Sequence, residues 1–328
     1  MANIKILATG GTIAGSAQLS TATTGYKAGA LGIDELLNAV PEIKDFANVT
    51  GEQICSIDSK DMTDDIWLKL AARINEIFAR DDVDGIVITH GTDTLEETAY
   101  FLNLTVHSSK PVVLTGAMRP ATAISADGSM NLLNAVRVAA SPESIGKGVL
   151  VALNDEINSA REVTKTNTLT LSTFKSPEIG LLGYVNAGTP EFYRMSTRRH
   201  TINSEFNLRG IKNLPHVKII YGHAGDDGIF VDAAIRAAVD GIVYAGTGNG
   251  SIHAHAEKFL ARATSKGIVV VRSSRVGGGT VIPAEKSYVD NKFLDGDNLS
   301  PQKARILLQL ALTKTKNLSE IQRMFKQY

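Results

Sequence analysis

Hydrophobic and polar positions along most of the chain follow two alternating patterns. Short apolar runs lie at residues 4–8, 85–88, 111–114 and 148–153. Helix-like stretches lie between them, at residues 32–40, 64–80, 94–104 and 130–140. The second of these helices is the clearest, because Ile66, Leu70, Ile74 and Ile77 follow the helical repeat and predict one buried face. Residues 85–88 are fully apolar and mostly β-branched, which is typical of a parallel strand covered on both faces.

The middle of the chain differs, and the alternation then resumes. Residues 158–215 are rich in Thr, Arg and Gly and show little periodicity. Strand-like runs follow at 217–221, 241–244 and 267–271, with helix-like stretches at 229–239 and 256–264 and a final helix at 301–314. Strands alternating with helices across short turns predict parallel sheets flanked by helices. We therefore expect two α/β domains: a larger one with a mostly parallel sheet at 1–190, a linker at 191–215 and a smaller parallel one at 216–328.

Composition narrows the class of protein. The chain has 328 residues, with 34 basic and 34 acidic side chains, so its formal charge is zero and no basic surface for nucleic acid is expected. No apolar run approaches the roughly 18 residues of a membrane helix. A single cysteine, Cys55, excludes an internal disulfide and a cysteine-based metal cage. The first residues lack the pattern of a signal peptide, so the chain as it stands is expected in the cytoplasm, or in the periplasm if a leader has been removed.

Two loops that follow predicted strands are candidate sites, since open parallel sheets bind ligands at the carboxyl ends of their strands. Residues 9–15 read Thr-Gly-Gly-Thr-Ile-Ala-Gly and match neither a dinucleotide fingerprint nor a phosphate-binding loop. Residues 89–97 place three hydroxyl side chains and Asp93 where a strand gives way to a helix. Thr92 or Asp93 there is either an N-cap or part of a site that stabilises an oxyanion.

The remaining candidates are a lysine and the histidines. Lys165 lies among threonines, where a lysine is usually solvated; buried beside a hydroxyl and a carboxylate, it would instead activate the hydroxyl as a nucleophile. His253 and His255 have no third ligand at a suitable spacing, and His90 is more simply a structural or solvent-facing side chain. No metal site is therefore expected.

Taken together, these stretches resemble the bacterial type II L-asparaginases and the related glutaminase-asparaginases. The matching segments, in the order of that family, are ATGGTIAG at 8–15, ITHGTDT at 88–94, SADG at 125–128, TKTN at 164–167, GTGNG at 246–250, RSSR at 272–275 and PQKAR at 301–305. They extend over essentially the whole chain.

The resemblance implies an amidohydrolase that converts L-asparagine to L-aspartate and ammonia, with secondary activity on L-glutamine and with no metal or organic cofactor. It implies Thr12 as the nucleophile that forms an acyl-enzyme, assisted by Tyr26 in a mobile loop at 16–30. Thr92, Asp93 and Lys165 form the implied second catalytic cluster, and the main-chain N–H groups of Thr12 and Thr92 hold the oxyanion.

The resemblance also implies the substrate contacts and the assembly. Ser59 and Asp93 bind the α-carboxylate and α-ammonium groups of the substrate, with Gly11, Ala117 and Thr92 as further contacts. Asn249 comes from a neighbouring subunit, so the implied working form is a homotetramer with intersubunit active sites.

Two positions depart from the family pattern. Lys60 follows Ser59 where Gln or Glu is usual, and it brings a positive charge toward the substrate ammonium. If residues 58–60 are extended, Asp58 and Lys60 share a face and can pair; otherwise Lys60 turns to solvent and binding is weaker. Glu285 is the nearest candidate for an acidic residue that the family brings to the substrate from the neighbouring subunit.

Two other functions compete with the amidohydrolase. One is a binding protein or sensor for amino acids that uses the same pocket without turnover, an alternative that Lys60 motivates. The other is a nucleotide-binding Rossmann protein, which the missing phosphate loop disfavours.

Overall fold

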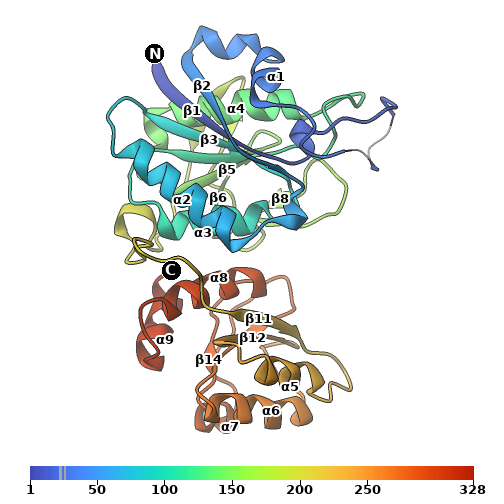
Figure 1. The fold of residues 1–328 in the computed structure, drawn as a ribbon, viewed down its shortest axis with the longest axis vertical. Coiled ribbons are helices and arrows are strands. Elements are labelled where there is room, and N and C mark those ends of the chain that lie inside the picture. Colours follow the sequence, from blue (N-terminus) through green and yellow to red (C-terminus); the bar gives the residue numbers. More distant parts are fainter. Residues whose placement is uncertain (22–23, 26) are drawn as a thin grey trace. The chain divides into compact units, whose positions relative to one another are not determined.

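The computed structural model describes residues 1–21, 24–25 and 27–328, which form two compact units, unit 1 (Met1–Leu208) and unit 2 (Arg209–Tyr328). Unit 1 is built on an eight-stranded sheet and unit 2 on a separate four-stranded sheet (Figure 1). The expected pair of α/β domains, the larger with a mostly parallel sheet, is confirmed.

The sheet of unit 1 has the strand order β10-β9-β6-β5-β4-β3-β1-β2. Neighbours from β5 to β2 pair in parallel, whereas β6, β9 and β10 extend the sheet in antiparallel pairs. The strands are β1 (Ala2–Gly10), β2 (Ala47–Ile57), β3 (Gly85–Thr89), β4 (Val112–Thr115), β5 (Val149–Leu153), β6 (Glu156–Ser159), β9 (Gly183–Asn186) and β10 (Thr189–Phe192). A separate two-stranded hairpin joins β7 (Thr164–Lys165) to β8 (Phe174–Lys175).

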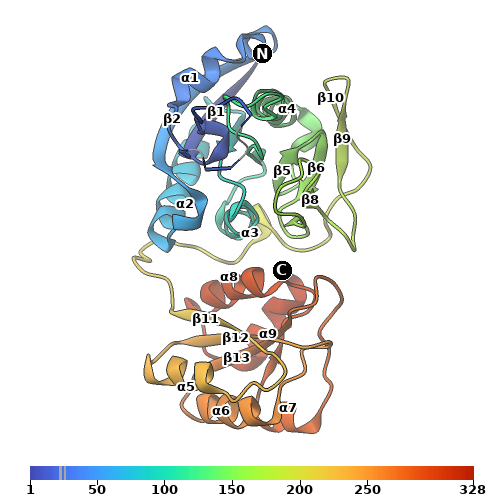
Figure 2. The same ribbon diagram turned by 90° about the vertical axis from the view of Figure 1, so that its right-hand side faces the viewer.

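Helices cover both faces of this sheet, as a parallel sheet requires. α1 (Ile33–Asn38) and α4 (Gly128–Ala140) lie on one face, and α2 (Asp64–Phe78) and α3 (Leu95–Thr105) lie on the other (Figure 2). Short 3-10 turns complete the unit: η1 (Thr12–Ala14), η2 (Pro41–Asp45), η3 (Ser59–Asp61), η4 (Pro142–Ser144) and η5 (Thr201–Asn203). α2 buries Leu70, Ile74 and Ile77 as its periodicity predicts, and Thr63 caps its first turn.

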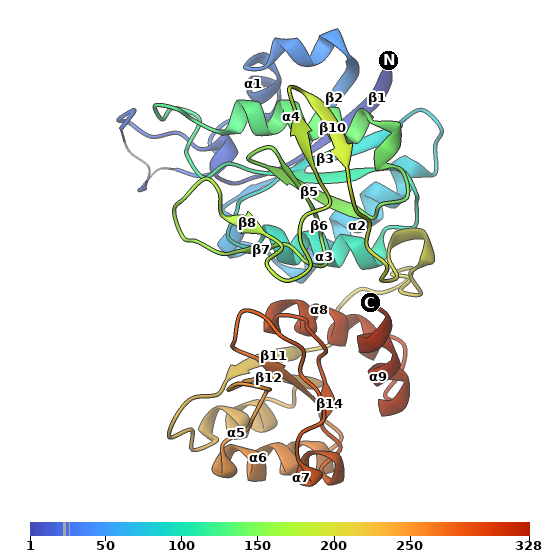
Figure 3. The same cartoon turned by 180° about the vertical axis from the view of Figure 1, so that it is seen from behind.

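Unit 2 is a small, fully parallel α/β domain with the strand order β11-β12-β13-β14. Its strands are β11 (Val217–Tyr221), β12 (Gly241–Gly246), β13 (Val269–Ser274) and β14 (Leu294–Asp295). Its helices are α5 (Ile229–Arg236), α6 (Ala254–Ser265), α7 (Lys286–Asp290), α8 (Pro301–Leu312) and α9 (Leu318–Gln327). α8 packs on one face of the sheet and α5 and α6 on the other (Figure 3). None of the helices in the described ranges is long and apolar enough to cross a bilayer.

The structure adds elements that the periodicity does not predict. β2 is an edge strand whose side chains are mostly half-exposed, so its apolar alternation is weak. The region from 158 to 215 holds strands of two to four residues, which are too short to display a period. The expectation that the helix at 301–314 is the last one is wrong, because α9 follows it and buries Ile321, Met324 and Phe325.

The division between the units falls at Leu208 and Arg209, inside the segment 191–215 expected as a linker. The first part of that segment packs on unit 1: the Ser204 hydroxyl donates to the carbonyl of Leu104, and His107 Nε2 donates to the carbonyl of Phe206 at 3.0 Å. The domain limits at 190 and 215 stay a prediction.

A buried chain of hydrogen bonds ties α2 and α3 to the end of β3. Trp67 Nε1 donates to the Thr98 hydroxyl at 2.8 Å, and that hydroxyl lies 2.9 Å from His90 Nε2. His90 Nδ1 lies 2.7 Å from the carbonyl oxygen of Gly91. A carbonyl only accepts, so Nδ1 carries the proton and Nε2 accepts from Thr98. His90 is therefore a neutral structural residue, as expected, and burial lowers its pKa to about 4.

This histidine makes the fold sensitive to acid. The unfolded chain binds a proton at His90 below about pH 6.5 and the folded chain only near pH 4, so stability is full above 6.5 and falls between these values. Between pH 7 and pH 4, we expect the free energy of unfolding to fall by about 3 kcal/mol more in the wild type than in His90→Gln. Denaturant titrations of both proteins across this range measure the difference, and parallel pH profiles would contradict the neutral, buried assignment.

Candidate active site

Four neighbouring strands deliver their following loops to one edge of the unit 1 sheet. The strands are β4, β3, β1 and β2, which are adjacent and parallel. Their carboxyl ends therefore meet at the same edge, where ligands of open α/β sheets bind. The loop after β1 contains Thr12, the loop after β2 contains Ser59, the loop after β3 contains Thr92 and Asp93, and the loop after β4 contains Ala117.

The loops after β1 and β3 touch through their main chains. Gly11 has φ 80°, and a Cβ added to it would lie 2.3 Å from the amide nitrogen of Gly91. A side chain at residue 11 is therefore excluded both by its conformation and by the neighbouring backbone. This approach places the residues that follow, Thr12 and Thr92, at the start of two abutting turns, and both are buried.

The loop after β2 is joined to the same place. Ser59 is buried, and its hydroxyl accepts a hydrogen bond from the Asp93 amide at 3.2 Å. Its carbonyl accepts from the Thr94 hydroxyl at 2.7 Å. A Cβ on Gly91 would lie 2.6 Å from the Ser59 Oγ, so the contact requires glycine there as well. Ser59 thus lies against the turn that carries Thr92 and Asp93.

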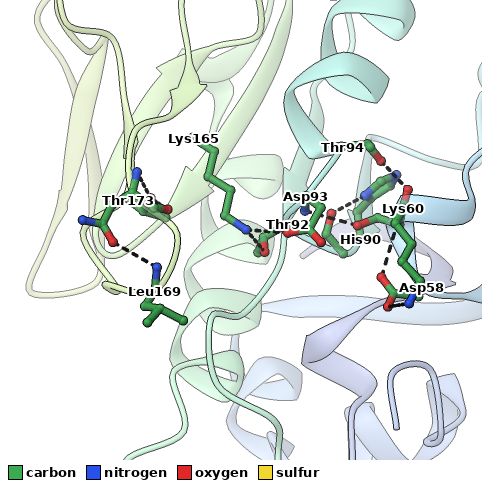
Figure 4. Close-up of polar contacts among 12 residues, drawn as sticks. Asp58, Lys60, His90, Thr92, Asp93, Thr94, Lys165, Leu169 and Thr173 are labelled. Atoms are coloured by element: carbon green, nitrogen blue, oxygen red, sulfur yellow. Dashed lines mark hydrogen bonds and ion pairs between the residues drawn. The ribbon is translucent and has the colours of Figure 1, made fainter. Parts of the chain in front are cut away.

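A lysine from a distant part of the chain completes this cluster. Lys165 Nζ donates to Thr92 Oγ1 at 3.0 Å and pairs with Asp93 Oδ1 at 2.6 Å (Figure 4). The Lys165 side chain is only 16% exposed, so the interpretation of this residue as a solvated lysine is wrong. A cation, a hydroxyl and a carboxylate are therefore held within hydrogen-bonding distance.

The hairpin β7–β8 presents this lysine. Lys165 pairs with Phe174 across the hairpin, and Lys175, opposite Thr164, forms an ion pair with Glu156 of β6. Next to Lys165, a pocket of about 560 Å³ is lined by Asp93, Lys165, Thr166, Asn167 and Thr168. Its volume suits a small polar ligand.

Neither Thr92 nor Asp93 is an N-cap, and that expectation is wrong. The N-cap of α3 is Thr94, and its hydroxyl binds the Ser59 carbonyl instead of the helix. The side chains of Thr92 and Asp93 both face Lys165 (Figure 4). N-capping therefore does not explain the positions of these two residues, whereas their contacts with Lys165 do.

Asp58 and Lys60 form an ion pair at the rim of the site. Lys60 Nζ lies 3.1 Å from Asp58 Oδ2, and 66% of the lysine side chain is exposed (Figure 4). The pairing expected from an extended segment occurs, but through a 3-10 turn in which Asp58 is the N-cap of η3. The hydrogen bond from Lys60 to Asp58 raises the pKa of the lysine, so its charge persists but is already paired.

The other predicted residues lie elsewhere or outside the described part. Asn249 and Glu285 both belong to unit 2, where the Asn249 side chain binds the main chain of Ile282 and Glu285 accepts from the Tyr288 hydroxyl at 3.4 Å. Tyr26 lies outside the described residues. Within the described ranges, no three His, Cys, Asp or Glu side chains are grouped to hold a metal.

The sequence offers no local signal for the side chains that support Lys165 and Asn249. Lys175 and Glu156 are 19 positions apart and meet only because β6 and β8 come together. Arg272 is part of a quoted motif, yet its partners come from separate segments of unit 2. In both cases the signal is a contact between distant segments.

The chain matches two family descriptions and is similar to known proteins over nearly its full length. Residues 3–198 match the family described as asparaginase, N-terminal, and residues 216–325 match the glutaminase/asparaginase C-terminal domain. The chain is 56% identical to L-asparaginase 2 of Bacillus subtilis strain 168, over 99% of this chain and 86% of that protein. It is 46% identical to the glutaminase-asparaginase of Pseudomonas fluorescens biotype A, over 100% of this chain and 91% of that protein.

A solved structure agrees with the sequence comparison. The probable cytoplasmic L-asparaginase from Campylobacter jejuni superposes with a TM-score of 0.98 at 50% identity, covering all of both chains. The family descriptions, the sequence identities and the superposition all extend over nearly the full length. The chain therefore belongs to the bacterial L-asparaginase and glutaminase-asparaginase family.

Proposed function

We propose that this protein hydrolyses the side-chain amide of L-asparagine to L-aspartate and ammonia, with secondary activity on L-glutamine. The observation that carries the proposal is the contact of the largely buried Lys165 side chain with Thr92 and Asp93, beside the turn that holds Thr12. Membership of the asparaginase family supports the same reaction.

The cluster supplies proton chemistry without histidine. An ammonium that donates to Thr92 Oγ1 occupies one acceptor site of that hydroxyl and leaves its O–H free to donate, and the Asp93 carboxylate balances the charge of the lysine. Thr92 then has its own proton available for the leaving amine or accepts one from a water.

Thr12 is the proposed nucleophile. Its hydroxyl oxygen would attack the amide carbon to form a tetrahedral intermediate, and the hydroxyl proton would be transferred to the amide nitrogen. The C–N bond then breaks, ammonia leaves and an acyl-enzyme remains. Water would then attack the acyl carbon, so that its hydroxyl group completes the aspartate carboxyl group and its proton returns to Thr12 Oγ1. The main-chain N–H groups of Thr12 and Thr92 would hold the oxyanion, since the two turns abut at Gly11 and Gly91. Tyr26 would assist the attack.

Substrate binding and assembly complete the proposal. Ser59 and Asp93 would bind the α-carboxylate and the α-ammonium groups, with Gly11 and Ala117 beside them. Asn249 and Glu285 would reach this site from a neighbouring subunit of a homotetramer.

The first prediction separates catalysis from binding. Thr12→Val and Lys165→Met should each lower ammonia release from L-asparagine by about 10³-fold or more, because each removes a group that reacts or moves a proton. Steady-state ammonia assays with both substrates test this, with circular dichroism to verify folding.

Lys175→Arg is the control, since it changes a lysine of the same hairpin but keeps the positive charge that pairs with Glu156. It should keep activity within about tenfold of the wild type. Saturable binding of L-asparagine by a folded wild type that releases no ammonia would overturn the hydrolase and favour the amino-acid-binding protein.

The second prediction concerns the charge of Lys60. Because Asp58 already pairs with this exposed ammonium, Lys60→Gln should lower KM for L-asparagine by less than about fivefold and leave kcat unchanged. Asp58→Asn keeps an N-cap side chain but frees the lysine, so it should raise KM. The double variant should return KM close to that of Lys60→Gln. A KM that falls in Asp58→Asn would contradict the pairing argument.

The third prediction concerns assembly. The mass in solution should be near four times 35.0 kDa at assay concentrations. Light scattering after size exclusion measures it. A fully active monomer would remove the proposed role of Asn249 from a neighbouring subunit.

A further inference from the structure

Arg272 is a fully buried cation at the centre of unit 2. It lies on β13, and its guanidinium forms an ion pair with Asp295 of β14. Burying a cation is unfavourable unless it is paired and hydrogen-bonded, so an arginine at this position requires several acceptors.

Most of those acceptors are main-chain carbonyls of two loops. One terminal nitrogen donates to the carbonyls of Asn249 and Gly250, each at 3.3 Å. The other donates to the carbonyl of Ile282 at 2.8 Å as well as to Asp295. A single side chain thereby fixes the loop after β12 and the segment before α7.

The Asn249 side chain connects the same two loops a second time. Its Oδ1 accepts from the Ile282 amide at 3.0 Å, and its Nδ2 donates to the Ile282 carbonyl at 3.3 Å. Asn249 is exposed, whereas Arg272 lies beneath it. The exposed amide group is therefore held from below by a buried charge.

Arg272 is also connected to Glu285, through the side chain of Tyr288. The guanidinium carbon of Arg272 lies 4.5 Å from the ring centroid of Tyr288, in a cation–π contact. The Tyr288 hydroxyl accepts from the Ile252 amide at 3.0 Å and donates to Glu285. Both residues of unit 2 that the proposed function uses, Asn249 and Glu285, are thus connected to one arginine.

We propose that Arg272 is a positioning residue of the hydrolase: it fixes the loops of Asn249 and Ile282 so that Asn249 is presented to substrate in one orientation. The inference rests on the proposed function for its kinetic part. Its structural part, the fixing of two loops by a buried guanidinium, stands on the contacts of unit 2 alone.

Arginine is the residue type that this role requires. Its planar fork donates in fixed directions to three carbonyls and a carboxylate, whereas a lysine ammonium has three donors on one flexible atom. Arg272→Lys retains the charge beside Asp295 but cannot reach all of these acceptors, so it isolates the positioning role from the charge.

The kinetic test is a double-mutant cycle. Arg272→Lys should raise KM for L-asparagine about tenfold and leave kcat within about threefold. In an Asn249→Ala background the same change should have little further effect, because the arginine acts through Asn249. Ser273→Ala is the matched control: it alters a buried residue of the same strand that binds Leu299 instead, and its kinetics should equal those of the wild type.

Amide hydrogen exchange provides a second readout that does not depend on activity. In Arg272→Lys, exchange should accelerate at least tenfold in segments 247–252 and 281–285 and stay unchanged in β11 and α5. Asp295→Glu keeps the charge of the pair but moves the carboxylate, so it should accelerate the same segments to a smaller extent, and it serves if Arg272→Lys does not fold.

The outcomes are distinct. Equal losses from Arg272→Lys with and without Asn249 would overturn the positioning role, and so would unchanged exchange in both segments. A wild type that releases no ammonia would defeat the proposed function, and the exchange result would still decide whether Arg272 fixes the loops.

Discussion

The main-chain contact between Gly11 and Gly91 is the constraint on which the site depends. Two parallel strands, β1 and β3, end side by side, and their turns approach so closely that a Cβ at Gly11 would overlap the main chain of Gly91, while a Cβ at Gly91 would overlap Ser59. The sheet sets the direction of the turns and the glycines set their separation. The next residue of each turn, Thr12 or Thr92, carries a hydroxyl and is buried. Ser59 joins the loop after β2 to the same turn, because its hydroxyl accepts from the Asp93 amide and its carbonyl accepts from the Thr94 hydroxyl.

Beneath this contact, the protein uses a neutral histidine where a charged one would be costly. His90 lies fully inside unit 1 and binds the Gly91 carbonyl on one side and Thr98 on the other. Because its ring is neutral, it fixes the turn without placing a second cation near Lys165. The charges of the cluster therefore come from Lys165 and Asp93, and the histidine fixes the position of the turn.

Sequence reasoning recovers most of the fold because the parallel strands are buried runs and the large helices are amphipathic. It misses β2, which is half-exposed at the edge of the sheet, and the short strands after residue 158, which lack a period. The candidate site is predicted from a different feature, the polar loops that follow the strands. The loops at 9–15 and 89–97 are predictable from strand ends, but the burial of Lys165 is not, since it depends on a hairpin anchored by Lys175 on Glu156. A local rule therefore favours a solvated lysine, and the tertiary contact overrides it.

Lys165 and Arg272 show why each residue type stands where it does. Lys165 faces a hydroxyl and a carboxylate and is partly accessible, so a flexible ammonium with several donors suits this pair of acceptors. Arg272 is fully buried and faces three carbonyls besides Asp295, so a rigid planar fork suits acceptors that lie in fixed directions on the main chain. Exchanging the two types would place a flexible ammonium under loops that need donors in fixed directions, and a rigid fork where one compact ammonium serves both Thr92 and Asp93. Unit 1 therefore has a lysine and unit 2 an arginine at these positions because the two side chains differ in flexibility and in donor geometry.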